Sequence, residues 1–66
     1  MTLQETIDSL AETYTVESVL LALEKFCRDK GDDAIRQYDD RDTAKAWNMQ
    51  ANSTGYAAQQ AKGRGL

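Results

Sequence analysis

The chain has no histidine, no proline and a single cysteine, Cys27, in its 66 residues. A lone cysteine excludes a disulfide bond within the chain. A tetrahedral zinc site needs about four Cys, His or carboxylate ligands, so the lack of histidine makes such a site hard to assemble. We therefore expect no metal, no cofactor and no covalent cross-link to stabilise this protein.

Long apolar runs are missing as well. The longest, from Val19 to Leu23, is far below the roughly 20 residues that span a bilayer. The first ten residues are acidic and amphipathic, and they lack the basic and apolar segments of a secretory signal. These absences predict a cytoplasmic protein with no membrane segment, in which Cys27 is a reduced thiol.

Acidic residues are missing from the last third of the chain. All eleven lie between Glu5 and Asp42, where five bases leave a net charge of 5 − 11 = −6, whereas residues 43–66 carry three bases and no acid. Either the two parts are complementary halves of one helical bundle, or they meet different partners.

The strongest pattern that is present is an apolar band in the middle of the chain. Its members recur at three- and four-residue steps: Val16, Val19, Leu20, Leu23, Phe26, Cys27, Ala34 and Tyr38. At about 100° per residue they share one face of an α-helix, roughly 120° wide. Gly31 could end or kink this helix. Because Ala34 and Tyr38 keep the phase, we expect one helix over residues 16–38, with a kink at Gly31 as the alternative.

A shorter helix is expected before this one. Thr2 and Glu5 have the spacing of a capping box, and apolar residues follow at helical spacing, which predicts a helix over about residues 3–12. Thr15 is a suitable N-cap for the central helix, because its hydroxyl can accept a hydrogen bond from a free backbone N–H group.

A third helix is expected over about residues 43–62, with Asp42 as its cap. Residues 52–55 are poor helix formers and could interrupt it. Mostly small residues recur along it at alternating three- and four-residue steps, in the spacing of a coiled-coil seam: Ala44, Trp47, Ala51, Thr54, Ala58 and Ala61. Trp47 is the one large apolar group in this seam, so we expect it to pack on the central helix near Leu23, Phe26 or Cys27, either of its own chain or of a neighbouring one.

Together these patterns predict an all-α fold in a single domain, residues 1–66. A short helix, a long central helix and a third helix folded back as a helical hairpin make up this fold. A core of this size rarely supplies more than about 3–5 kcal/mol. Leu21 lies outside the apolar band and suggests a second apolar contact. We therefore expect oligomerisation, most simply a dimer, to complete the fold.

The chain also resembles a group of known sequences. The similarity consists of an amphipathic opening, then Thr-Val-Glu-Ser-Val-Leu-Leu-Ala-Leu-Glu at residues 15–24, Cys-Arg-Asp-Lys at 27–30 and Thr-Ala-Lys-Ala-Trp at 43–47. In this order of features the chain resembles small, all-helical proteins of unknown function from bacterial and phage genomes, over about Leu3 to Trp47. The resemblance implies an all-helical fold and no particular activity, ligand or functional residue.

No group of residues predicts catalysis. Cys27 lies inside the apolar band with no histidine to act as its base, which favours a buried core thiol over a nucleophile. Residues 29–33 lack the oxygen spacing and the closing Glu of a calcium loop. The central helix begins with Val16 and Glu17, and phosphates would repel Glu17, which argues against direct nucleic-acid binding.

The remaining hypothesis is a non-catalytic, cytosolic protein-interaction module that self-associates through helix packing. The alternative is an acidic, phage-type inhibitor or adaptor that binds a basic surface of a host nucleic-acid-binding protein. The candidate partner-binding residues are an apolar pair and an acidic cluster: Leu21, Trp47, Asp32, Asp33, Asp39, Asp40 and Asp42.

Overall fold

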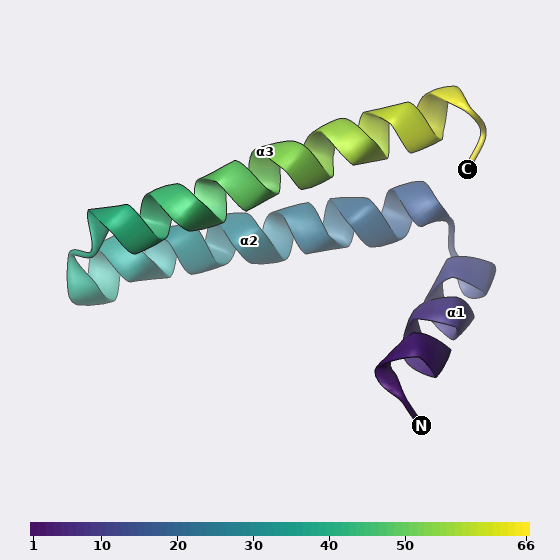
Figure 1. Ribbon diagram of the computed structural model, residues 1–66, viewed down its shortest axis with the longest axis horizontal. Coiled ribbons are helices and arrows are strands. Elements are labelled where there is room, and N and C mark those ends of the chain that lie inside the picture. The colour runs from purple at the N-terminus through teal and green to yellow at the C-terminus, as the bar shows by residue number, and fades with distance from the viewer.

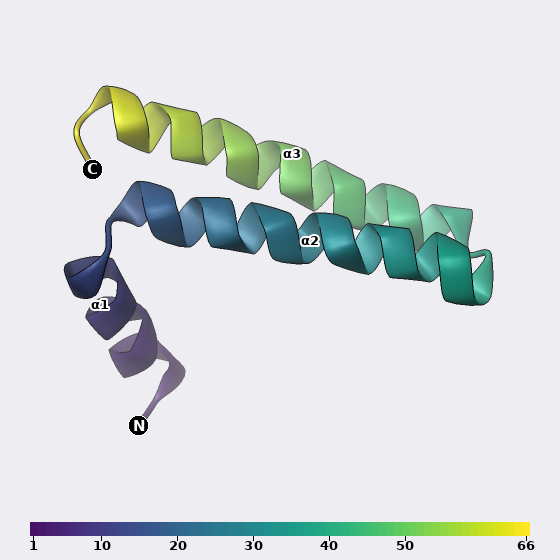
Figure 2. The same ribbon diagram turned by 180° about the vertical axis from the view of Figure 1, so that it is seen from behind.

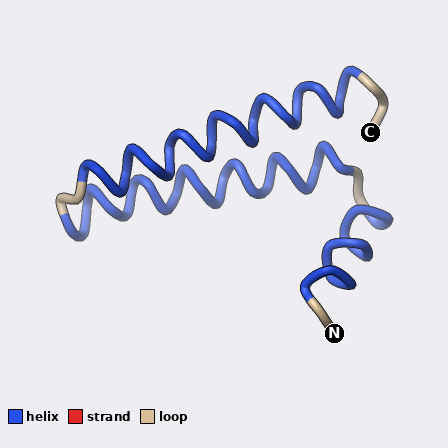
Figure 3. The backbone as a smooth tube through the Cα atoms, in the orientation of Figure 1, coloured by secondary structure: helices blue, strands red, loops and turns tan.

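The computed structural model describes residues 1–66 and contains three α-helices and no strand. The helices are α1 (Leu3–Thr13), α2 (Val16–Tyr38) and α3 (Arg41–Gly63) (Figure 1). The predicted all-α fold, with a short helix, a long central helix and a third helix folded back on it, is confirmed. Figure 3 shows that the only non-helical segments are the two short connections and the two ends of the chain.

Local side-chain hydrogen bonds determine where the first two helices begin. The Thr2 hydroxyl accepts from the Glu5 backbone N–H, and the Glu5 carboxylate accepts from the Thr2 backbone N–H, both at 3.1 Å, which completes the expected capping box. These hydrogen bonds to Thr2 lower the pKa of the Glu5 carboxyl group. The Thr15 hydroxyl accepts from the Ser18 N–H at 3.0 Å and caps α2, as expected.

The expectation that Asp42 caps the third helix is wrong. The N-cap is Asp40, whose carboxylate accepts hydrogen bonds from the Thr43 backbone N–H at 3.0 Å and from the Thr43 hydroxyl at 2.7 Å. Asp39 adopts a left-handed conformation with φ of 47°, which reverses the chain within two residues. Because this turn is so short, the cap falls two residues earlier than the sequence suggested.

Neither long helix is interrupted. α2 is continuous through Gly31, and α3 is continuous through residues 52–55. The two helices approach closely at Gly31. A Cβ atom at this position would lie only 2.9 Å from the Asn48 side chain and 3.4 Å from the Ala44 carbonyl oxygen. The Thr54 hydroxyl donates to the Gln50 carbonyl oxygen at 2.7 Å, so it is satisfied within the helix. Interhelical packing therefore outweighs the weak helix propensity at these positions.

The core of the α2–α3 hairpin is made of small residues. Its buried members are Gly31, Ala34, Ala44, Ala51, Ala58 and Ala61, and no large side chain is fully buried. Trp47 is half-buried at the edge of this seam, and its ring packs edge-on against Phe26, with centroids 5.9 Å apart and planes at 82°. The expected packing of Trp47 on the central helix is thus confirmed, although the fully buried residues are a glycine and five alanines.

The three helices form one thin layer. The Cα atoms extend over 38 × 31 × 13 Å, and a helix with its side chains is about 10–12 Å across. Figures 1 and 2 show α2 and α3 running antiparallel while α1 diverges from α2, with its N-terminal end farthest from the hairpin. None of the helices is long and apolar enough to cross a membrane. Apolar faces above and below such a layer have no second layer to cover them.

Candidate interaction surface

An apolar groove lies between α1 and α2 and has a volume of about 440 Å³. We call it the α1–α2 groove. One wall of the groove is a stripe of α1 and the other is a flank of α2. Eight residues line the groove, and all except Ser18 are classed as hydrophobic: Ile7, Leu10, Tyr14, Ser18, Val19, Ala22, Leu23 and Phe26. The two walls converge at the Tyr14–Thr15 connection, where the chain passes from α1 into α2 (Figure 1).

The groove exists because the apolar band of α2 is wide enough to face both α3 and α1. One side of the band faces α3, since Gly31 and Ala34 are buried there. The other side, with Leu23 and Phe26, is only partly covered by α3: these side chains remain 45% and 50% exposed, although the Phe26 ring also contacts Trp47. A band about 120° wide is broader than the contact that a single alanine-lined helix can cover. The surplus apolar surface of α2 therefore faces solvent beside α1.

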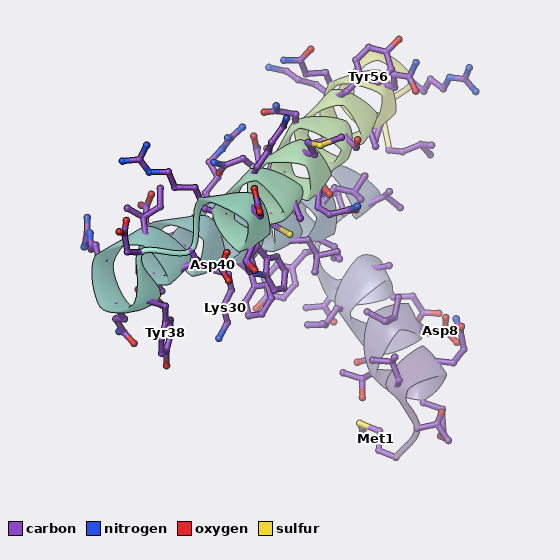
Figure 4. All side chains as sticks on the ribbon, turned by 60° about the vertical axis from the view of Figure 1, so that its left-hand side comes forward. Met1, Asp8, Lys30, Tyr38, Asp40 and Tyr56 are labelled. Atoms are coloured by element: carbon purple, nitrogen blue, oxygen red, sulfur yellow. The ribbon has the colours of Figure 1, made fainter.

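No charged residue lines the groove, and one charged group, Lys30, lies at its edge. The Lys30 ammonium nitrogen lies 5.7 Å from the centre of the Phe26 ring, in a cation–π contact at the groove's edge. On α1, Asp8 accepts a hydrogen bond from Gln4 at 2.8 Å, and Figure 4 shows Asp8 on the side of α1 turned away from the hairpin. An uncharged groove of this kind suits the burial of apolar surface.

The structure separates the two apolar candidates that the sequence indicated. Trp47 contacts Phe26 and so joins α3 to the inner edge of the α1–α2 groove. Leu21 is 46% exposed on the opposite flank of α2, where it lines a polar hollow. Its neighbours there include the ion pair between Arg28 and Glu24, at 2.7 Å. Leu21 and Trp47 therefore do not belong to one surface.

The acidic candidates gather around the α2–α3 turn, and all five are exposed: Asp32, Asp33, Asp39, Asp40 and Asp42. The chain has two ion pairs, Lys25–Asp29 at 3.0 Å and Arg28–Glu24 at 2.7 Å, and both lie within α2. No ion pair joins the acidic part of the chain to the bases of residues 43–66. No three Cys, Asp or Glu side chains form a group that could hold a metal ion.

Sequence reasoning did not identify the α1 wall of the groove as part of a site. Ile7, Leu10 and Tyr14 were expected only as the apolar stripe of a short helix. One signal could have identified them. The apolar band of α2 is wide enough to contact two helices, so the apolar stripe of α1 could be expected to lie beside the part of this band that α3 does not cover. Cys27, expected to be fully buried, is a free thiol that is only partly buried, because small residues line the facing helix.

The Asp40 cap leads to a prediction about pH. Hydrogen bonds from Thr43 lower the pKa of the Asp40 carboxyl group below its unfolded value, so the cap stabilises the native state at neutral pH. That contribution should be lost as the pH falls through the lowered pKa. We expect Asp40→Ala to lower the melting temperature at pH 7, and Asp40→Asn to retain most of it, because asparagine also caps helices well.

Thermal melts followed by circular dichroism between pH 7 and pH 3 measure this effect. Asp40→Asn should lose less stability on acidification than the parent protein. Asp33→Asn is the control, because Asp33 is exposed and makes no hydrogen bond or ion pair. An Asp40→Ala protein that melts like the parent at pH 7 would contradict the role of this cap.

Comparison with known protein families, curated proteins and solved structures finds no match to this chain.

Proposed function

We propose that this chain is a small, non-catalytic protein-interaction module of the cytoplasm that self-associates as a dimer by helix packing over the α1–α2 groove. The observation that carries the proposal is that an apolar groove opens to solvent on a protein only one helix layer thick. Stable domains bury the apolar faces of their helices between at least two layers. A second copy supplies the missing layer.

The accessible surface area supports this proposal quantitatively. The chain exposes 5237 Å², whereas a compact monomer of the same mass exposes about 4,200 Å². The excess is roughly 1,000 Å², and a specific interface of standard size buries about 800 Å² on each partner. The surface that this monomer exposes beyond a compact fold is thus about the amount that one stable dimer interface removes from water.

The composition of the groove favours a second copy over a charged partner. The groove walls are apolar, and obligate homodimer interfaces are more apolar than other interfaces. A two-fold dimer uses the same patch on both copies, so a self-complementary apolar face satisfies both at once. No charged residue lines the groove, and Asp8 lies on the side of α1 turned away from the hairpin, so these parts of the two copies bring no like charges together.

Two leucines on α2 provide a matched test of which face is buried. Leu23 and Leu21 are 45% and 46% exposed and lie on opposite flanks of the same helix. We expect Leu23→Lys to weaken the dimer by roughly 100-fold, because it places a charge in the buried centre of the interface. Leu21→Lys should leave the dimer intact.

Light scattering on a size-exclusion column and sedimentation at several protein concentrations measure the result. The parent and the Leu21→Lys protein should have twice the mass of the 7.4 kDa chain, and the Leu23→Lys protein should dissociate on dilution. A parent protein that stays monomeric at micromolar concentration with a concentration-independent melt would contradict the proposal. Dissociation by Leu21→Lys alone would place the interface on the opposite flank of α2.

A second candidate function is an acidic, phage-type inhibitor or adaptor that binds a basic surface of a host nucleic-acid-binding protein. The observation that favours it is the exposed acidic cluster at the α2–α3 turn, which no base of the chain pairs with. Replacing Asp32 and Asp33 together by asparagine separates the two functions. This variant should retain the dimer, and a loss of binding to a basic protein captured by the parent would support the second candidate.

A further inference from the structure

We infer that each copy places its α1 helix in the α1–α2 groove of the other copy, so that two interlocked arms hold the dimer together. The inference rests on the proposed dimer and names the segment that occupies the groove. The four helices α1 and α2 of both copies then form a core of large apolar side chains, which the alanine-lined α2–α3 hairpin does not have.

The helix α1 projects from the α2–α3 hairpin as an arm that is attached at one end only. Only Tyr14 and Thr15 connect it to α2, and its contacts with the rest of the chain are sparse compared with those between α2 and α3. Figures 1 and 2 show its axis diverging from α2 toward the N-terminus. Leu3, in its first turn, is 78% exposed. The apolar side chains of this arm thus reach beyond the surface that their own chain can cover.

The apolar stripe of α1 has the pattern of a helix that docks in a groove. Leu3, Ile7, Leu10 and Tyr14 follow the i, i+4, i+7, i+11 spacing with which amphipathic helices anchor in apolar grooves. In contrast, the small-residue seam of α3 is already buried against α2. Of the three helices, α1 therefore has the apolar stripe best suited to fill the groove of a second copy.

The dimensions and charges of α1 also fit the groove. An 11-residue helix is about 16 Å long, and the α2 wall from Val19 to Phe26 rises about 10 Å, so one arm covers the wall completely. Because Asp8 lies on the side of α1 away from its stripe, docking leaves this carboxylate in solvent.

Symmetry makes the contact reciprocal. The stripe of α1 both lines the groove of its own chain and fills the groove of the other, so a two-fold axis between antiparallel arms forms the same contact twice. Ile7 is the stripe residue nearest the middle of α1, which spans Leu3–Thr13. Two antiparallel arms therefore bring Ile7 of one copy within about one helical turn of Ile7 of the other.

Cross-linking of full-length protein through a single introduced cysteine tests this arrangement. In a Cys27→Ser background, Ile7→Cys places a thiol on the stripe, and Asp8→Cys places one on the opposite side of the same arm. A short bis-maleimide reagent at micromolar protein concentration should join two Ile7→Cys chains at least tenfold faster than two Asp8→Cys chains. Circular dichroism and light scattering on both variants confirm that each retains its helices and its dimer.

Each outcome bears on the inference. Faster cross-linking at position 7 supports interlocked arms. Equal rates at the two positions, or no cross-link at position 7 in a protein that light scattering shows to be a dimer, overturn the interlocked arms but leave the proposed dimer standing. A monomeric protein without cross-links at either position overturns both.

Discussion

Replacing Trp47 by alanine should unfold this protein or dissociate its dimer. The Trp47 ring is the one large group in a seam of alanines, and its edge-to-face contact with Phe26 connects α3 to the apolar flank of α2. Truncating a tryptophan in a core costs about 3–5 kcal/mol, and because Trp47 is half-buried we expect a loss toward the lower end of this range. The whole stability of a chain of this length is about 3–10 kcal/mol, so the loss is comparable to the total.

Urea denaturation followed by far-ultraviolet circular dichroism measures this effect without relying on tryptophan fluorescence. Met49→Ala is the control, because Met49 lies two residues further along the same helix and is exposed. We expect this control to change the free energy of unfolding by less than about 0.5 kcal/mol. If Trp47→Ala retained the parent's helicity and denaturation midpoint, the ring would contribute little to the hairpin and would be free to bind another protein.

Replacing Ala51 by leucine should separate the two long helices. Ala51 is 0% exposed in the middle of the α2–α3 seam, so a larger side chain has no space unless α3 moves away from α2. Overpacking of this kind typically costs about 1–3 kcal/mol. In a domain of this size that loss corresponds to a fall in melting temperature of roughly 5–20 °C.

Thermal melts at a single protein concentration test this prediction. Ala46→Leu is the matched control, because it makes the same change on the same helix at an exposed position. It should leave the melting temperature nearly unchanged. An Ala51→Leu protein that melts with the Ala46→Leu control would show that the helices can separate at little cost, and the close approach of α2 and α3 would then not be a source of stability.

The fold class and the packing partners within the hairpin could be predicted from the sequence because their causes are local or periodic. Hydroxyl groups at Thr2 and Thr15 can satisfy the free N–H groups of a nearby helix end, and this depends on a spacing of three residues. The step of three and four residues between alanines marks a helix face that another helix can approach. These patterns were sufficient to place Trp47 on the central helix near Leu23, Phe26 or Cys27, and the structure shows that its ring packs against Phe26.

The sequence by itself thus determined that this protein is all-helical and that a small-residue seam joins its two long helices. Only the tertiary structure decided that Asp40 and not Asp42 caps α3, because the tight turn at Asp39 depends on how closely α2 and α3 approach. It also divided the apolar band of α2 between α3 and the α1–α2 groove. A periodic pattern records the width of an apolar face, whereas the part left exposed depends on the size and direction of the helices packed against it.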